Sequence, residues 1–331
     1  MNNKNTVITC QLEKLKISYY NQPDKKWQIS ALNKAIDNLN KYEHTITSGE
    51  EVQKEIKGIG KKIALYINEI LEGGTIKELE KKDVQEQSYN DFMNIVGVGK
   101  AKANEWISKD IYTIDQLKEK VEQKTISLTD NIKLGLKYYE DLKIRIPRKH
   151  IDTLKKSMHQ ILQKIDKELM FEICGSYRRK QSNSGDIDFL ISHPKYNMAL
   201  NSDNIKYNYL KKIVQELKVK NIIVDEMTKN STKKFLGMCK ISGYTPICRI
   251  DIMFIEYPSY YSSIMYFTGN KYFNLYIRNK CLEKNYSLNE YYLKNIINDE
   301  KIYLKDEKHI FEILQIPYLN PENRNFLNIK K

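Results

Sequence analysis

The chain has 331 residues, of which 41% are hydrophobic and 29% charged. That length suffices for two or three compact domains, and the composition is typical of a folded globular protein and excludes a disordered one. The formal net charge of +13 favours a polyanionic partner, and nucleic acid is the usual one.

The five cysteines are dispersed and form no C-x-x-C pair. This argues against a disulfide framework and a zinc cluster, and for a reducing compartment. No apolar run approaches the roughly 18 residues of a membrane span, so we expect a soluble, intracellular protein without a membrane partner. The sequence does not distinguish a nuclear from a viral or cytoplasmic location.

The first third of the chain has the apolar periodicity of short helices. The positions that recur at this spacing are Ile29, Leu32, Ala35, Ile36 and Leu39, and then Ile63, Ile67, Ile70 and Leu71. Two related phrases, Gly58-Ile-Gly-Lys and Gly97-Val-Gly-Lys, lie between the helices. One such phrase alone is equally typical of an ordinary helical turn. Two copies in a basic region favour helix-hairpin-helix motifs, which grip the DNA backbone without reading sequence.

After about residue 150 the pattern changes to short β-prone runs between helices. A helix over 151–165 precedes the runs 169–174, 187–191, 221–224, 235–241 and 247–255, and helical patterns cover 207–217 and 273–282. This order is typical of an α+β fold in which helices flank a mixed sheet. We therefore expect an all-α N-terminal half and an α/β C-terminal half.

The most specific motif runs from Gly175-Ser176 to Asp186-Ile-Asp188. Side chains alternate along a strand, so the two aspartates face the same side. Carboxylates this close repel each other unless a cation lies between them, and oxygen ligands favour Mg²⁺. An isolated Asp-x-Asp is more often a turn cap or a salt bridge. The preceding Gly-Ser pair favours a metal site over these alternatives, because its N–H groups and hydroxyl can bind a phosphate beside the metal.

A third acid, Asp251, lies in the alternating apolar phrase Arg249-Ile-Asp-Ile-Met. Three carboxylates can hold the two ions of an in-line phosphoryl displacement. We expect Asp251 to be both a metal ligand and a candidate acceptor of the primer 3′-hydroxyl proton. Ser176, Arg145 and Arg179 are candidate triphosphate contacts because a guanidinium fork matches phosphate oxygens.

The phrase Tyr266-Phe-Thr-Gly269 combines aromatic side chains with a glycine turn. By itself it is well explained by packing. Beside a triphosphate site it predicts a contact to the sugar that excludes a 2′-hydroxyl. Asn274 and Arg278 follow on a predicted helix and are expected to face the minor groove of the nascent base pair.

Over nearly its whole length the sequence resembles the family X DNA polymerases. The collinear matching phrases are Gly58-Ile-Gly-Lys-Lys-Ile-Ala, Gly97-Val-Gly, Gly135-Leu-Lys-Tyr-Tyr, Arg145-Ile-Pro-Arg, the block from Gly175 to Asp188, Arg249-Ile-Asp-Ile, Tyr266-Phe-Thr-Gly and Asn289-Glu-Tyr. The resemblance implies a lyase-like helical domain over 1–83, a fingers-like region over 84–147, a nucleotidyltransferase palm over 148–257 and a thumb-like region over 258–331. It also implies a monomer that fills gaps in gapped or nicked DNA from deoxynucleoside triphosphates during base excision repair.

The resemblance also assigns site residues by position. Metal binding falls on Asp186, Asp188 and Asp251, and triphosphate binding on Arg145, Ser176, Arg179, Ser184, Gly185, Tyr266, Phe267, Gly269 and Asn274. Template or primer contacts fall on Arg249, Arg278 and Tyr291. A sodium or potassium ion at each hairpin is implied, held by carbonyls of Lys54, Ile56 and Ile59 and of Met93, Ile95 and Val98.

The sequence departs from the family pattern at Tyr66, which stands where the family has its Schiff-base lysine. Tyrosine has no amine with which to form an imine. Lys62, one helical turn earlier, is the candidate substitute, and the 5′-deoxyribose phosphate lyase activity therefore stays open. Met253 and Lys271 also replace an arginine and an acid of family members.

Two other functions stay open at this stage. One is a template-independent or RNA-tailing enzyme with the same palm, against which the paired hairpins argue. The other is a non-catalytic scaffold that binds DNA ends, against which the complete set of three aspartates argues.

Overall fold

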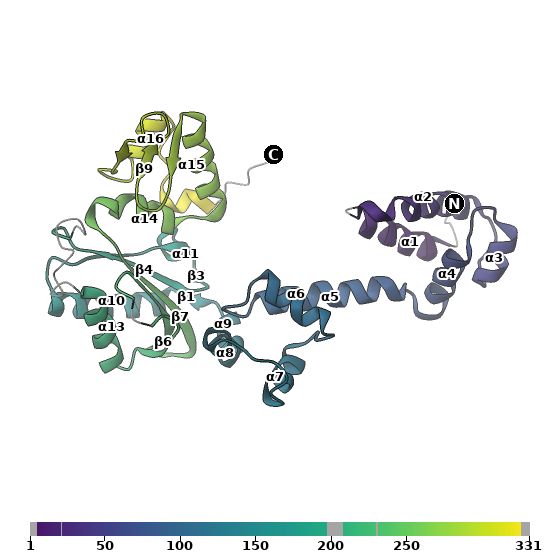
Figure 1. Ribbon diagram of the computed structural model, residues 1–331, viewed down its shortest axis with the longest axis horizontal. Coiled ribbons are helices and arrows are strands. Elements are labelled where there is room, and N and C mark those ends of the chain that lie inside the picture. Colours follow the sequence, from purple (N-terminus) through teal and green to yellow (C-terminus); the bar gives the residue numbers. More distant parts are fainter. Residues whose placement is uncertain (1–4, 21, 197–207, 230, 326–331) are drawn as a thin grey trace. The chain divides into compact units, whose positions relative to one another are not determined.

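The computed structural model describes residues 5–20, 22–196, 208–229 and 231–325. The chain divides into two compact units, Met1–Ser127 and Leu128–Lys331. Figure 1 labels many of the helices and strands of both units.

Helices and turns make up the described part of the first unit. Its helices are α1 (Thr6–Tyr19), η1 (Pro23–Lys25), α2 (Lys26–Lys41), α3 (Gly49–Glu55), α4 (Lys61–Gly73), α5 (Lys77–Met93), α6 (Lys100–Ser108) and α7 (Ile114–Glu122). The predicted apolar periodicity is confirmed, because Leu32, Ala35, Ile36 and Leu39 form the buried face of α2. On α4 the buried face includes Tyr66, whereas Leu71 is exposed.

The two glycine phrases form hairpins of the same construction, one between α3 and α4 and one between α5 and α6. Gly58 and Gly97 have φ angles of +100° and +92°, a backbone region that glycine adopts without a steric penalty. In each hairpin the residue after this glycine donates its N–H to the carbonyl three residues earlier, at 3.3 Å and 3.0 Å. The expected pair of helix-hairpin-helix motifs is therefore confirmed.

The second unit combines helices with three sheets. Its helices are α8 (Asp130–Lys137), α9 (Tyr139–Lys143), α10 (Arg148–Ile165), α11 (Gly175–Arg178), α13 (Tyr209–Val219), η3 (Tyr257–Ser259), α14 (Tyr260–Thr268), α15 (Lys271–Glu283), α16 (His309–Leu314) and η4 (Pro321–Asn325). Its strands are β1 (Ile146–Pro147), β2 (Met170–Ile173), β3 (Asn183–Ser184), β4 (Ile187–Ser192), β5 (Ile223–Glu226), β6 (Lys234–Ile241), β7 (Tyr244–Phe254), β8 (Tyr286–Leu288), β9 (Leu293–Asn295) and β10 (Lys301–Ile302).

The main sheet has the strand order β2-β4-β7-β6-β5 and is mixed. Only its β4–β7 pair is parallel, and that pairing sets Asp188 opposite Asp251. Apolar side chains of α10 and α13 share one core with this sheet, and both helices lie beside it in Figure 1. The runs predicted as strands are thus strands, while Tyr207, where the predicted second helix begins, lies outside the described residues.

A smaller antiparallel sheet of order β10-β9-β8 packs with α15 and α16 around a second core. The expected fold class is therefore confirmed: a helical hairpin region, a palm with a mixed sheet and a C-terminal α+β part. Of the predicted domain boundaries, the one after residue 83 falls inside α5. The division into four domains stays a prediction.

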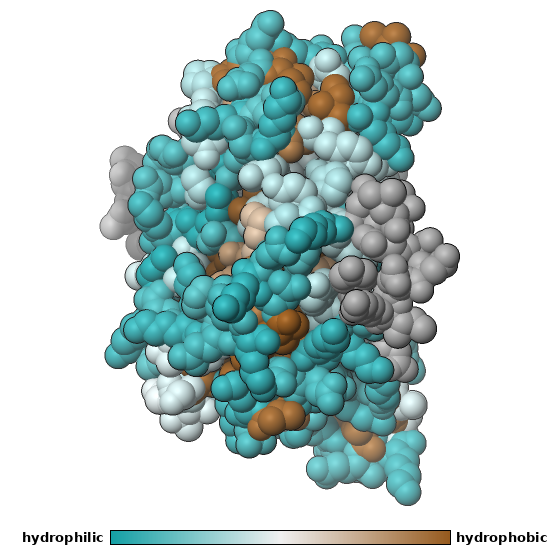
Figure 2. Space-filling model, turned by 90° about the vertical axis from the view of Figure 1, so that its left-hand side faces the viewer, coloured by the Kyte–Doolittle hydropathy of each residue, from teal (hydrophilic) through white to brown (hydrophobic). Residues whose placement is uncertain are grey.

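The polar face in Figure 2 and the unpaired cysteines are what the charged composition and the dispersed cysteines predict. The face drawn in Figure 2 is mainly hydrophilic, with small separate apolar patches. All five cysteines are free thiols. Within the described ranges, none of the helices combines the length and the apolar character that crossing a bilayer requires.

Candidate active site

A cleft of about 550 Å³ lies where α11, the turn before β4 and the α14–α15 turn converge. Segments far apart in the sequence thus meet at one place. The predicted site residues that line the cleft are Arg145, Ser176, Arg179, Gly185, Asp186, Asp188, Tyr266, Phe267, Gly269 and Asn274.

The three aspartates form a mutually repelling set. Asp186 directly precedes β4, Asp188 lies on it, and Asp251 lies beside Asp188 on β7. Burial, followed by the charges of Asp186 and Asp251, raises the pKa of the Asp188 carboxyl to about 7. Burial raises the pKa of Asp186 as well, against the opposing charge of Arg249. Carboxylates destabilised in this way are a donor set that fits divalent cations.

Arg249 supplies the positive charge nearest to this set. Its Nε lies 3.0 Å from Oδ1 of Asp251, and its Nη2 lies 2.7 Å from Oδ2. The sequence predicted that Arg249 contacts the primer or the template. In the structure its guanidinium is instead bonded to Asp251, which is a predicted metal ligand. A cation bound by both oxygens of Asp251 would therefore have to displace Arg249.

Two glycines admit the neighbouring functional groups. A Cβ on Gly175 would lie 2.6 Å from Oδ2 of Asp188, and the φ of Gly175 is +57°. A Cβ on Gly185 would lie 2.9 Å from Nη1 of Arg145. Gly175 is required by its positive φ as well as by this contact, whereas a side chain at position 185 would displace the guanidinium of Arg145.

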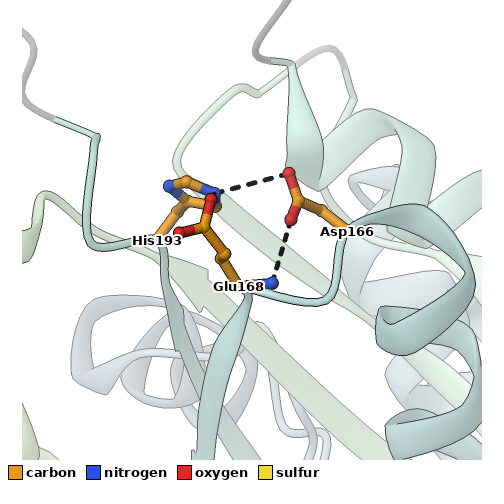
Figure 3. Close-up of side chains that lie close together, drawn as sticks. All are labelled: Asp166, Glu168 and His193. Atoms are coloured by element: carbon orange, nitrogen blue, oxygen red, sulfur yellow. Dashed lines mark hydrogen bonds and ion pairs between the residues drawn. The ribbon is translucent and has the colours of Figure 1, made fainter.

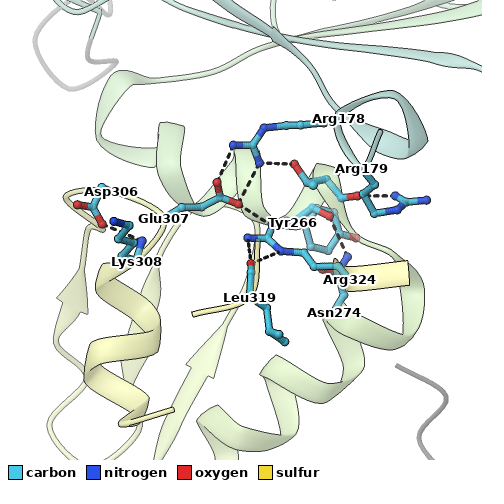
Figure 4. A network of polar contacts seen from close by, with 10 residues as sticks. Arg178, Arg179, Tyr266, Asn274, Asp306, Glu307, Lys308, Leu319 and Arg324 are labelled. Atoms are coloured by element: carbon cyan, nitrogen blue, oxygen red, sulfur yellow. Dashed lines mark hydrogen bonds and ion pairs between the residues drawn. The ribbon is translucent and has the colours of Figure 1, made fainter. Parts of the chain in front are cut away.

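The last turn of α14, which carries Tyr266 and Phe267, borders the cleft on another side. The rings of Tyr266 and Phe267 meet edge to face with centroids 5.2 Å apart. Asn274 donates its Nδ2 to the Tyr266 carbonyl at 2.8 Å, as Figure 4 shows. The guanidinium carbon of Arg278 lies 5.2 Å from the Tyr266 ring centroid. Tyr291 is 42% exposed and lies outside the cleft lining.

Ser184 is placed differently from the other predicted triphosphate contacts. Its side chain is buried, and among the described residues its hydroxyl has no hydrogen-bond partner. A contact to a triphosphate would require this hydroxyl to become accessible. Its assigned role stays a prediction.

Beside the cleft lies a buried charge network that the sequence did not reveal (Figure 4). Arg178 donates to Glu307 through Nη1 at 3.0 Å and Nη2 at 2.7 Å, and Arg324 donates to it through Nη1 at 2.6 Å. Burial opposes ionisation of Glu307, but the two guanidinium groups hold its pKa below the ordinary value. No local pattern marks Glu307, because its partner Arg178 lies 129 positions away.

A second group of candidate ligands, Asp166, Glu168 and His193, lies near one end of β2 and β4 (Figure 3). Asp166 already accepts the Glu168 N–H at 2.9 Å and the Tyr209 hydroxyl at 2.8 Å. Nδ1 of His193 accepts the Lys195 N–H at 3.1 Å, which puts the proton of a neutral imidazole on Nε2. Nε2 faces Asp166 at 3.4 Å. Internal bonds account for this cluster, and we assign no ion to it.

In the first unit, Tyr66 and Tyr19 both donate a hydrogen bond to the carboxylate of Glu78. The Tyr66 hydroxyl donates to Oε2 of Glu78 at 2.7 Å, and the Tyr19 hydroxyl donates to Oε1 at 2.7 Å. Burial raises the pKa of Tyr66 far above its ordinary value. Nζ of Lys62 lies 5.6 Å from the Tyr66 ring centroid. The candidate lyase amine therefore lies beside the position of the missing lysine.

Trp27, which was not among the predicted site residues, is 86% exposed at the start of α2. A tryptophan is seldom left in water without a role, because burying it is favourable. The signal was available, since Trp27 follows Lys25-Lys26 and lies off the apolar face of α2.

The mixed sheet with its aspartates and the paired hairpins match the arrangement that the resemblance to the family X DNA polymerases predicts. Comparison with known families makes this more specific. Residues 145–257 match the DNA polymerase beta palm and residues 263–325 the DNA polymerase beta thumb. Residues 90–143 match the fingers domain of DNA polymerase lambda, and residues 3–76 match a helix-hairpin-helix domain. These matches follow one another along the chain, which is therefore similar to the family X DNA polymerases in its palm, thumb, fingers and helix-hairpin-helix regions.

Curated relatives include DNA polymerase lambda of Rattus norvegicus, which is 28% identical over 98% of this chain. DNA polymerase lambda of Arabidopsis thaliana is 29% identical over 88% of it. The chain spans 57% of the length of each of these relatives.

Proposed function

We propose that this chain is a template-directed DNA polymerase that adds deoxynucleotides to a primer 3′-hydroxyl in short gaps during base excision repair. The observation that carries the proposal is the set of three carboxylates, of which Asp251 is buried and Asp186 and Asp188 are half-buried, beside a cleft lined by Arg145 and Arg179. Divalent cations held by these carboxylates, together with the two arginines, would suit a reaction in which negative charge develops on phosphate oxygens.

In this proposal Asp186, Asp188 and Asp251 hold two Mg²⁺ ions. When bound, these ions neutralise charge on the attacking and leaving oxygens. The remaining steps belong to the chain itself. Arg145, Arg179, Ser176 and the Gly185 backbone bind the triphosphate, and Asp251 is the candidate acceptor of the 3′-hydroxyl proton. The Tyr266 to Gly269 turn contacts the sugar and excludes a ribonucleotide.

The DNA is held by the two hairpins, whose exposed backbone suits phosphate contacts without sequence reading. A sodium or potassium ion at each hairpin would bridge its carbonyls to the phosphate. The remaining predicted contacts, to template and primer, are those of Arg249, Arg278 and Tyr291. The substrates are gapped or nicked duplex DNA and deoxynucleoside triphosphates, and the acting form is a monomer.

Primer extension on DNA with a single-nucleotide gap tests the proposal. We expect Mg²⁺-dependent addition of the complementary nucleotide and little addition of the other three. If the protein instead extended single strands without regard to a template, the result would favour the template-independent nucleotidyltransferase over the proposed polymerase. Binding of gapped DNA without any extension would favour the scaffold.

We propose Lys62 as the amine of the lyase step, because its ammonium lies beside the Tyr66 ring. We expect borohydride to trap the chain on an incised abasic site, and Lys62→Ala to reduce the trapping about tenfold or more, since an imine needs that amine. Lys61→Ala and Tyr66→Phe are the controls and should trap like the wild type. Undiminished trapping with Lys62→Ala would exclude Lys62.

We propose that Trp27 stacks on an unpaired template base in the gap, next to the charges of Lys25 and Lys26. Trp27→Ala should weaken binding of gapped DNA about tenfold, because stacking on one base contributes roughly 1–3 kcal/mol. The salt dependence of binding should not change, since no charge is removed. Val7→Ala, another exposed apolar side chain of this unit, is the matched control. Equal affinities for Trp27→Ala and wild type would refute the stacking role.

A further inference from the structure

The guanidinium of Arg179, a proposed triphosphate contact, is held from two sides. Its Nε donates to Oδ1 of Asn325 at 2.7 Å, and its Nη1 donates to the Thr268 carbonyl at 2.5 Å. Thr268 ends α14 and Asn325 ends η4, so two elements of the C-terminal part fix the side chain of Arg179, which directly follows α11.

Asn325 is itself immobilised. Its Nδ2 donates to the backbone carbonyls of Arg179 and Glu322, at 3.3 Å and 3.1 Å. The preceding residue, Arg324, is fully buried and bonds to Glu307 and to the Leu319 carbonyl. The carboxamide oxygen of Asn325 is therefore held in place as the acceptor for Nε of Arg179.

These two bonds leave the outer fork of the guanidinium available. A guanidinium has five N–H donors, and one on Nε and one on Nη1 are used. In the described part of the chain Nη2 has no hydrogen-bond partner. Nη1 and Nη2 together form the fork that binds two phosphate oxygens at once. Arg179 lines the cleft, and the charges of Asp188 and Asp186 act on it.

We propose that Asn325 is a positioning residue for triphosphate binding: it turns Nη2 and the remaining N–H of Nη1 of Arg179 toward the phosphates. The inference rests on the proposed function and assigns to η4 a part in it. Ordering a free arginine on binding costs side-chain entropy, and a guanidinium already held at Nε has met most of that cost.

A neutral carboxamide suits this role. A carboxylate at position 325 would bond to Nε equally well but would neutralise the charge that attracts the triphosphate. An apolar side chain would leave the charge and remove the orientation.

The test measures binding of a complementary deoxynucleoside triphosphate, with Mg²⁺, to the full chain on gapped DNA whose primer ends in a dideoxynucleotide. Single-turnover extension on the normal primer gives the chemical rate separately. We expect Asn325→Ala to raise the Kd of the triphosphate about tenfold, the loss of one hydrogen bond to a charged group. The rate at saturating triphosphate should change less than about threefold, because the bond is made before the chemical step.

Two further variants separate positioning from a general structural effect. Asp299→Asn breaks only the surface pair of Asp299 with Lys294, at 2.8 Å, and should bind like the wild type. In an Arg179→Ala background, Asn325→Ala should cost nothing, because its effect passes through Arg179.

The inference is overturned if Asn325→Ala binds the triphosphate as well as or better than the wild type, or if it costs the same in both backgrounds. If the wild-type chain neither binds the triphosphate nor extends the primer, the proposed polymerase function itself is refuted.

Discussion

Asp188→Asn should make the metal-free protein more stable while it abolishes Mg²⁺-dependent extension. The reason is the burial of Asp188 and, after it, the charges of Asp186 and Asp251, which together raise the pKa of this carboxyl to about 7. Asparagine has nearly the same shape and no charge to desolvate. Removal of this destabilised charge should stabilise the second unit by about 1–3 kcal/mol above pH 8, while extension falls by roughly a thousandfold or more.

The pH dependence follows from the direction of the shift. A carboxyl group whose folded pKa exceeds its unfolded value of about 3.9 favours the protonated folded state. Its penalty on wild-type stability is absent below the unfolded pKa and grows as the pH rises through about 7. The stability difference between Asp188→Asn and wild type should therefore be near zero at pH 4 and reach its full size by pH 8.

The measurement is chemical or thermal denaturation in EDTA at several pH values, repeated with Mg²⁺. Mg²⁺ should stabilise the wild type and have little effect on Asp188→Asn, because the variant lacks a ligand. Glu312→Gln, an exposed carboxyl of the same unit, is the control and should change stability by less than about 0.5 kcal/mol. A variant less stable than the wild type at pH 8 would contradict this account of Asp188.

The geometry of the candidate site was predictable because much of it is encoded locally. Asp186 and Asp188 share a strand face through simple alternation, and the glycine phrases of both hairpins mark turns that only a few residue types allow. The burial of Asp251 also followed from its apolar flanks. The parallel pairing that brings Asp251 beside Asp188 is a tertiary contact, and the sequence supported it only through the family resemblance.

Contacts between distant polar residues were not predictable in the same way. Arg179 meets Asn325 over 146 positions and Arg178 meets Glu307 over 129. A chain with 55 Lys and Arg and 42 Asp and Glu offers many such pairings, and periodicity ranks none of them. Tyr66 shows the intermediate case. The sequence identified the missing amine, but only the fold shows that Glu78 engages its hydroxyl.

The Glu307 network should carry a large share of the stability of the second unit. Oε1 of Glu307 accepts from both Arg178 and Arg324, and Oε2 accepts a further N–H of Arg178. In Glu307→Gln one of these acceptors becomes an N–H donor that faces a guanidinium. Two arginines, one of them fully buried, then lack a counter-charge. Breaking a buried pair in this way costs about 3–5 kcal/mol.

The pH dependence of this effect is opposite to that of Asp188. The folded pKa of Glu307 is held below its ordinary value, so its contribution is complete above the ordinary carboxyl range. It is lost as the pH falls toward the lowered folded pKa. Urea denaturation at pH 7 should therefore show the full destabilisation of Glu307→Gln, and the difference from wild type should shrink in acid.

Glu322→Gln, which removes an exposed pair nearby, is the matched control and should cost less than about 1 kcal/mol. Glu307→Gln within about 0.5 kcal/mol of the wild type would show that solvent already compensates the two arginines. The expected loss has a functional consequence as well. Arg324 precedes Asn325 and is anchored on Glu307, so loosening it should also free Arg179, and triphosphate affinity should fall together with stability.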